Sequence, residues 1–448
     1  MEHPFLHAQA LTDEYKLLFN PYHDQGVAVL NPVAQQLWQQ FQQPQHLHEI
    51  MPLSPEQDVT ADVQTLFQLG LLQPTGYHPQ PRKATPKVLN TWIHVTNECN
   101  LRCDYCYINK TADDMPADVG RATVDAILRA AVRYGFQQVK LKFAGGEATL
   151  NLKRVFDIHS YAMEQAQAKG IAVDTVVLSN GVAIGERAIE EFEQRGIRVS
   201  ISLDGIGDAH DAQRPFSNGR GSFAWVNRTL DRLMARNIKP FISITLSNRN
   251  ADGLADVIQY VVERDLPFNI NFFRENECAT SHTDLKLHDD KIIDGMYRAF
   301  AVLEANLPER CLLSTLVDRA QFNTPHDKTC SVGDSYLVID HKGNIAKCQM
   351  EIERPITSIY AEDPLALLRE DRLGIQNMSV EEKEGCRNCA WKYWCTGGCP
   401  ALTYRATGRY DVKSPNCRIY KALYPELLRL EGLRLLKLAA REQLERIN

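Results

Sequence analysis

The sequence has little that would carry the chain into a membrane or out of the cell. Its first residues, MEHPFLHAQALTDEYK, lack the basic segment and apolar core of a secretory signal peptide. No stretch approaches the roughly eighteen uninterrupted apolar residues of a membrane-spanning helix. The formal net charge of -6 gives no reason to expect nucleic acid or an anionic membrane as a partner. We therefore expect a cytoplasmic globular protein.

Disulfide bonds are not expected in that compartment, because it keeps thiols reduced. The chain nevertheless contains 12 cysteines. Three of them lie between residues 99 and 106, and seven lie between residues 330 and 417. Clustered cysteines in a reducing compartment more often bind metal or take part in catalysis. The cysteines are therefore the main guide to function.

Residues 1–73 are predicted to form a small domain of their own. The segments YKLLFN and GVAVLN predict a hairpin, and Asn31 can cap a helix that begins at Pro32 and runs to about residue 41. A second helix is expected over residues 55–69, ended by Gly70. This order predicts a winged-helix-like domain.

The next segment, residues 74–89, is rich in proline and is predicted to be a linker. After it, apolar runs alternate with helical stretches, which is typical of parallel β/α units. The sequence thus predicts an α/β fold with a partial (β/α)6 TIM-like barrel over residues 90–310. Its six strand candidates are TWIHVT, VKLKFA, VDTVVL, RVSISL, PFISITL and FNINFF.

Distinctive loops follow the first four of these strands. They contain CNLRCDYCY, GGE, SNG and DG, in that order. Because chemistry in such sheets gathers at the carboxyl ends of the strands, we expect all four loops on one rim.

Cys99, Cys103 and Cys106 supply three thiols, whereas a purely structural zinc or iron-sulfur site uses four protein ligands. Three protein ligands leave one coordination position of the metal site open for a small molecule. A structural zinc knuckle is the alternative, although no fourth ligand lies near in sequence.

The spacing Cys-x3-Cys-x2-Cys, with the aromatic Tyr105 before the last cysteine, resembles the radical S-adenosylmethionine (SAM) superfamily over residues 90 to about 273. The resemblance implies a 4Fe-4S cluster on the three thiolates, with SAM chelated to the open iron. It also implies a 5′-deoxyadenosyl radical and an external electron donor of flavodoxin or ferredoxin type.

The same resemblance suggests roles for the other loops. Gly145 and Gly146 would let the backbone approach the ligand, and Glu147 would receive the methionine ammonium. Ala148 follows where the family often has proline. Further SAM contacts would come from Tyr105, Asn180, Ser202, Asp204 and Arg214, the last toward the methionine carboxylate. Taken singly, these motifs could be turns, core packing or a surface ion pair.

The spacing of the last seven cysteines resembles the SPASM extension of radical enzymes that act on peptides and proteins, here over residues 311–417, before a C-terminal helix over 418–448. The resemblance implies two auxiliary 4Fe-4S clusters. One would be held by Cys386, Cys389, Cys395 and Cys417, and the other by Cys330, Cys348 and Cys399. Structural zinc is the alternative.

Two departures from the sulfatase-maturing relatives are informative. Tyr336 stands where they have an eighth cysteine, so one cluster keeps an open iron unless Cys278, Cys311 or the peptide fills it. Cys278 and Cys311 are expected to be ordinary buried thiols. Gln349 stands where those relatives have a catalytic aspartate, which disfavours aldehyde formation because an amide is no base at neutral pH.

Residues 1–73 resemble the leader-recognition element of peptide-modifying enzymes, which would add the leader as a strand beside the hairpin. A dimerisation domain is the alternative.

Together these features predict a maturase of ribosomally made precursor peptides that forms a carbon-carbon or thioether crosslink. Backbone excision, epimerisation, a sulfatase-type or small-molecule reaction, and a non-catalytic peptide-binding scaffold stay open, and no general base can be identified.

Overall fold

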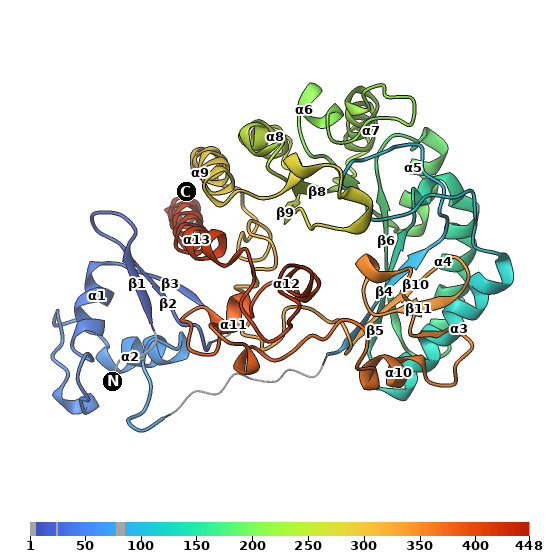
Figure 1. Ribbon diagram of the computed structural model, residues 1–448. Helices are drawn as coiled ribbons and strands as arrows, with labels where there is room; N and C mark the ends of the chain where they lie inside the picture. Colours follow the sequence, from blue (N-terminus) through green and yellow to red (C-terminus); the bar gives the residue numbers. More distant parts are fainter. Residues whose placement is uncertain (1–5, 24–25, 78–85, 448) are drawn as a thin grey trace.

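The computed structural model describes residues 6–23, 26–77 and 86–447, and it contains two β-sheets (Figure 1). The smaller sheet is antiparallel with the strand order β1-β2-β3. Strands β2 and β3 form the predicted hairpin, whereas β1 was not predicted because HAQA lacks β-branched and aromatic residues. The strands are β1 (His7–Ala10), β2 (Lys16–Phe19) and β3 (Val27–Leu30).

Two helices follow this sheet. In the first, α1 (Pro32–Gln39), the side chain of Asn31 accepts a hydrogen bond from Ala34 N at 2.8 Å, as its predicted capping role requires. The second, α2 (Val59–Gln68), begins later than predicted because Asp58 caps it through Ala61 N at 3.0 Å. Gly70, with φ +70°, follows its end. The winged-helix class of this region stays a prediction, and residues 78–85 of the expected linker lie outside the described residues.

The larger sheet contains all six predicted strands, which pair in parallel and in chain order. Helices cover its outer side (Figure 1). The strands are β4 (Val88–His94), β5 (Gln138–Ala144), β6 (Ala172–Ser179), β7 (Arg198–Ser202), β8 (Phe241–Leu246) and β9 (Phe268–Phe272). The helices are α3 (Ala117–Arg133), α4 (Leu152–Gln167), α5 (Glu186–Arg195), α6 (Asp208–Asp211), α7 (Phe223–Ala235), α8 (Leu254–Glu263) and α9 (Asp289–Ala305).

The C-terminal hairpin extends this same sheet. Strands β10 (Tyr336–Ile339) and β11 (Asn344–Ala346) turn at Gly343, whose φ is +84°, as predicted. Strand β10 then pairs in parallel with β4, and β12 (Thr357–Ser358) pairs with β11, giving nine strands in all. This junction was not predicted, because a short hairpin carries no signal for the edge it joins.

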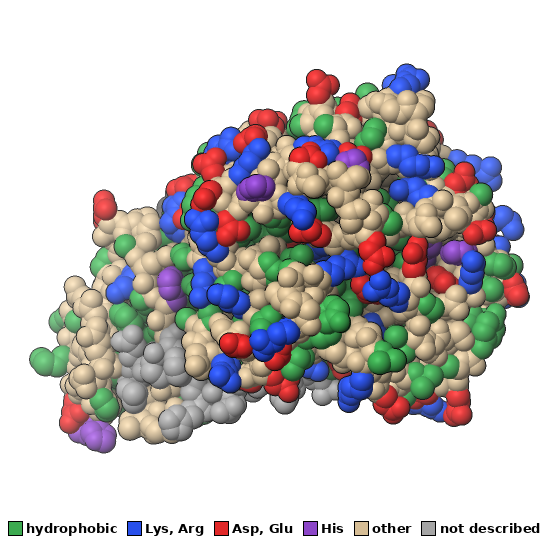
Figure 2. Space-filling view, viewed as in Figure 1, with side chains coloured by type: hydrophobic (Ala, Val, Ile, Leu, Met, Phe, Trp, Pro, Cys, Tyr) green, Lys and Arg blue, Asp and Glu red, His purple; other side chains and the backbone are tan. Residues whose placement is uncertain are grey.

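The remaining helices are α10 (Pro364–Glu370), α11 (Lys392–Cys395), α12 (Pro400–Thr407) and the predicted long C-terminal helix, α13 (Cys417–Ile447). In the described residues, no helix is both long and apolar enough to cross a bilayer. On the face shown in Figure 2, basic and acidic side chains are interspersed.

The N-terminal sheet packs directly against the C-terminal part of the chain. Leu17 and Phe19 are buried in the main core, and the Phe19 ring lies 4.9 Å from that of Trp394. At Gly432 in α13, a Cβ atom would lie 2.7 Å from Leu17 Cδ1. The small N-terminal region is therefore docked on α13.

Candidate functional site

The cysteine loop lies directly after β4 and accepts backbone hydrogen bonds from the loop after β5. Gly146 N donates to Thr96 O at 2.8 Å, and Glu147 N donates to Glu98 O at 2.8 Å. A Cβ atom on Gly145 would lie 2.3 Å from Thr96 O, and one on Gly146 would lie 2.2 Å from Glu98 O. Only glycine permits this approach, so both glycines position the cysteine loop. Their predicted approach to a ligand stays a prediction.

The three thiols of this loop lie close enough to affect one another. Burial raises the pKa of Cys103 to about 12, against the lowering effect of Arg214, and Cys106 and Cys99 raise it further. In the described part of the chain, no three His, Cys, Asp or Glu side chains converge as ligands of a single metal ion. A 4Fe-4S cluster binds each thiolate at a different iron, so its ligands stand farther apart.

Glu147 is a buried carboxylate beside this loop. Its Oε1 accepts from Thr149 N, Thr149 Oγ1 and Ser179 Oγ at 3.0, 2.6 and 2.8 Å, and its Oε2 accepts from Asn180 N at 2.6 Å. It forms no ion pair with a described residue, and only 2% of its surface is exposed. A buried carboxylate without a cation fits the ammonium group of SAM.

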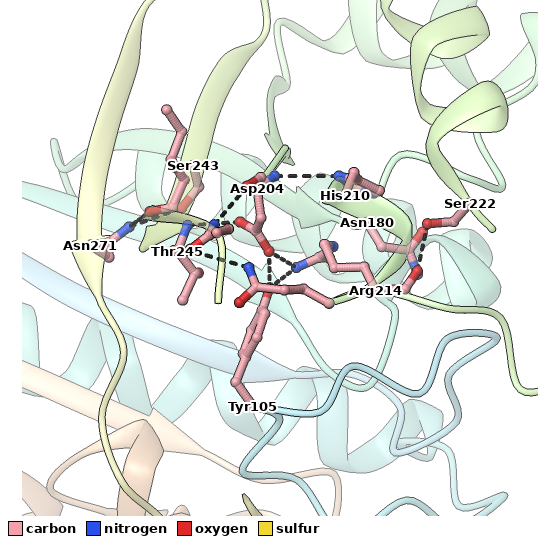
Figure 3. A network of polar contacts seen from close by, with 12 residues as sticks. Tyr105, Asn180, Asp204, His210, Arg214, Ser222, Ser243, Thr245 and Asn271 are labelled. Atoms are coloured by element: carbon pink, nitrogen blue, oxygen red, sulfur yellow. Dashed lines mark hydrogen bonds and ion pairs between the residues drawn. The ribbon is translucent and has the colours of Figure 1, made fainter. Parts of the chain in front are cut away.

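Tyr105, Asp204 and Arg214 form a buried network at the same rim (Figure 3). The Tyr105 hydroxyl donates to Asp204 Oδ2 at 2.6 Å, and Arg214 Nη1 lies 3.4 Å from the same oxygen and donates to the Tyr105 hydroxyl. Arg214 Nε is buried and has no hydrogen-bond partner among the described residues. The guanidinium therefore keeps one donor for a ligand such as the SAM carboxylate.

Asn180 joins this rim to the cysteine loop, whereas Ser202 does not. Asn180 Nδ2 donates to Asn100 Oδ1 at 2.7 Å and lies 3.9 Å from Cys99 Sγ. The Ser202 side chain, at the end of β7, forms no hydrogen bond with another described residue.

Three further residues orient Asp204 and were not predicted. Thr245 N donates to Asp204 Oδ1 at 2.7 Å, Asn250 Nδ2 donates to Asp204 O at 2.6 Å, and His210 Nδ1 accepts from Asp204 N at 3.3 Å. Applying the strand-end rule to the loop after the fifth strand, β8, would have pointed to Asn250, which acts through its side chain.

Four of the C-terminal cysteines line one small pocket. They are Cys386, Cys389, Cys395 and Cys417. Burial raises the pKa of Cys386 to about 12, with a further increase from Cys395. The ammonium of Lys383, which donates to Thr396 O at 2.7 Å, lowers the pKa of that thiol and would stabilise thiolates. This donor set fits an iron-sulfur cluster with four protein ligands.

The other three cysteines of the extension, Cys330, Cys348 and Cys399, line a cavity of about 660 Å³. At the position of the missing cysteine, the Tyr336 hydroxyl donates to Gln349 Oε1 at 3.0 Å.

The expectation that Cys278 and Cys311 are buried is wrong. Both are exposed: Cys278 lies in the short 3-10 helix η4 (Glu277–Ala279) and Cys311 lies in a loop, and neither lines the cavity.

Residues 93–261 match the profile of the Radical SAM superfamily. This segment is a radical SAM domain. Such domains bind SAM and a 4Fe-4S cluster. The chain is 22% identical to a serine-type anaerobic sulfatase-maturating enzyme from Bacteroides thetaiotaomicron over 347 residues, which cover 69% of this chain and 81% of that one.

Two solved structures share the fold of this chain. The AdoMet-bound enzyme anSMEcpe matches with a TM-score of 0.64 at 18% identity, over 78% of this chain and 99% of that one. SuiB from Streptococcus suis, bound to its precursor peptide SuiA, matches with a TM-score of 0.50 at 15% identity, over 93% of this chain and 99% of that one.

Proposed function

We propose that this protein is a radical SAM maturase that modifies a ribosomally synthesised precursor peptide and forms a carbon-carbon or thioether crosslink. The observation that carries the proposal is the joint placement of the cysteine loop, the cation-free Glu147 and the Tyr105-Asp204-Arg214 network on one rim. The likeness to SuiB, whose structure contains a precursor peptide, favours a peptide as the substrate.

The chain's own residues would hold the cofactors. Cys99, Cys103 and Cys106 would bind the radical SAM cluster, and the two C-terminal sets of cysteines would bind two auxiliary clusters. Glu147 would receive the SAM ammonium, and the free Nε of Arg214 would donate to its carboxylate. When bound, these groups supply a 5′-deoxyadenosyl radical that removes a hydrogen atom, and acceptors for the electron that a crosslinking substrate must lose.

The leader of the peptide would pair with the outer edge of β3. Asn20 N donates to Gly26 O, and hydrogen-bonded and open pairs alternate along an antiparallel ladder. The N-H groups of Val27 and Val29 therefore point away from β2, and neither donates to a described residue. These outward groups would give backbone affinity for an added strand.

Co-expression with short reading frames beside the gene tests the proposed reaction. We expect one product peptide to lose two hydrogen atoms per crosslink by mass spectrometry, and purified enzyme to release 5′-deoxyadenosine. Cys103→Ala should abolish both. A protein that binds the peptide without producing 5′-deoxyadenosine would be a scaffold, and formylglycine on a sulfatase peptide would show a sulfatase-type enzyme.

Leader recognition is tested separately by Val29→Pro, which removes an outward donor but no bond of the β2-β3 ladder. We expect the affinity for the precursor to fall about tenfold, close to the loss of one or two backbone hydrogen bonds. Glu98→Gln, in the cysteine loop, is the control and should leave the precursor affinity unchanged. Unchanged binding by Val29→Pro would argue against this edge.

A further inference from the structure

The cavity beside Cys330, Cys348 and Cys399 is lined by the inner side of the barrel sheet and by residues 314–332. Ser243 and Asn271 lie in its wall, and Asn271 Nδ2 donates to Ser243 Oγ at 3.1 Å. Ser243 O accepts from Leu203 N at 3.1 Å, next to Asp204. Figure 3 shows Ser243 and Asn271 beside the Asp204 network. The cavity, whose wall includes no residue of the Asp204 network, thus lies beside that network and reaches the auxiliary thiols, where the core peptide would lie.

Four cations line this cavity, against one carboxylate. Two of the cations, Lys140 and Arg198, already share Asp174, at 3.6 Å from Lys140 Nζ and 2.6 Å from Arg198 Nη2. The lining carboxylate, Asp318, accepts from Arg274 Nη2 with both oxygens, at 2.7 and 2.8 Å. Lys140, Arg198 and Asp318 are therefore each paired with an opposite charge within the protein.

The other two cations, Lys142 and Arg319, have no such partner. Neither side chain forms a hydrogen bond or an ion pair with any residue that the structure describes, although the Lys142 ammonium lies 5.9 Å from the centre of the Tyr336 ring. The pKa of Lys142 is lowered to about 8 by burial and by the like charges of Lys140 and Arg319. Both side chains are partly buried and their like charges repel, so an anion bound in the cavity would stabilise both.

The backbone of Arg319 supports the same conclusion. Its φ is +61°, in the left-handed region that a long side chain seldom adopts. Such strain persists where the surrounding structure fixes it and is often associated with a binding function. Asp318, Cys399 and Cys330 raise the pKa of Arg319 and could offset part of its charge, whereas for Lys142 only Asp174, which already pairs with Lys140 and Arg198, acts in that direction.

Resting on the proposed maturase function, we propose that Lys142 and Arg319 bind a carboxylate of the core peptide inside this cavity. The substrate would carry an acidic side chain, or its own C-terminus, at that place. The uncharged amides of Asn90, Asn269 and Gln321 in the same wall suit the peptide backbone.

Calorimetry on the full, iron-reconstituted chain under anaerobic conditions tests this directly. The probes are three synthetic tripeptides: N-acetyl-Ala-Glu-Ala-amide, its Gln counterpart, and N-acetyl-Ala-Gln-Ala with a free C-terminus. We expect one of the two carboxylate peptides to bind about tenfold more tightly than the neutral one, and which one it is identifies the source of the carboxylate.

Variants separate the two cations from their neighbours. Lys142→Gln and Arg319→Gln should each remove the preference, Lys142→Arg should keep it, and Lys140→Gln, whose charge is already compensated by Asp174, should keep it as well. Iron content and visible absorption show whether each variant retains its clusters.

Equal binding of the three peptides, no measurable binding of any, or a preference that survives Lys142→Gln would overturn the proposal. The result is independent of the maturase assay, because it measures binding without turnover. A maturase with a neutral substrate would fail this test and still release 5′-deoxyadenosine, whereas a scaffold could pass it and release none.

Discussion

Asp204 is the residue on which the buried rim network depends. It is the only acid that forms an ion pair with Arg214 in the described structure, and it also accepts from Tyr105 and Thr245. Loss of this acid would leave a buried guanidinium without its counter-ion.

Asp204→Asn should therefore lower the free energy of unfolding by about 3–5 kcal/mol. Thermal unfolding of the purified protein measures this. Asp252→Asn is the control, because Asp252 pairs with Lys291 and Arg298 at the exposed surface and should cost less than about 1 kcal/mol. Equal losses in the two variants would contradict a special role for Asp204.

His94, at the end of β4, should make the protein sensitive to acid. Its Nε2 lies 2.9 Å from Asn97 Oδ1, the His341 ring lies 6.0 Å away, and burial lowers its pKa to about 4. The unfolded chain takes up a proton near pH 6.5 and the folded chain does not, so stability falls as the pH drops from 6.5 toward 4. We expect about 2 kcal/mol to be lost between about pH 6.5 and pH 5.

Urea unfolding at these two pH values tests this expectation. His94→Gln should reduce the pH dependence without abolishing it, because burial also lowers the pKa of His210 to about 3, whereas a change at the exposed His48 should leave the dependence as it is. An unchanged pH dependence in His94→Gln would show that other groups cause the loss.

The sequence could indicate the types of residue at the site but not their contacts. The two glycines before Glu147 suggested close approach to a ligand, whereas the structure places Gly145 and Gly146 against the cysteine loop. Thr245 contributes through its backbone N-H, which any residue could supply, so its identity carries no signal. Cys278 lies in a single turn of 3-10 helix, which is too short for a hydrophobic pattern that would predict its exposure.

At the scale of elements, the strands were predictable because apolar, buried residues recur at every second position, while the residues between them face the inner cavity. The hairpin at Gly343 was predictable from its turn residues. The pairing of β10 with β4 was not, because it joins residues more than two hundred positions apart and depends on which sheet edge is left open.

The contact between the N-terminal sheet and α13 depends on one small residue. Gly432→Val should push Leu17 and Leu11 away from the helix, because even a Cβ atom there would lie 2.7 and 3.0 Å from them. We expect faster hydrogen exchange in β2 and β3 and a loss of about 1–3 kcal/mol. Ala439→Val, at an exposed position of the same helix, should leave exchange in β2 and β3 unchanged.

At the scale of the whole molecule, the three sets of thiols predict iron for three clusters in anaerobically prepared protein. Simultaneous replacement of Cys99, Cys103 and Cys106 by alanine should remove one third of the iron and all 5′-deoxyadenosine formation, and leave the auxiliary absorption in place. Iron analysis and visible spectroscopy check both results. Colourless protein that contains zinc would contradict the cluster assignment.

The strand β10 also limits how such an enzyme can be rearranged. Val338 lies opposite Trp92, and a shift of one residue would turn every side chain of β10 to the other side of the sheet. A chimaera joined between residues 310 and 336 must therefore supply a strand that fits the β4 edge in both length and phase. The pairing of β10 with β4 therefore limits which C-terminal extensions of distant relatives could replace this one, even where the number of cysteines is the same.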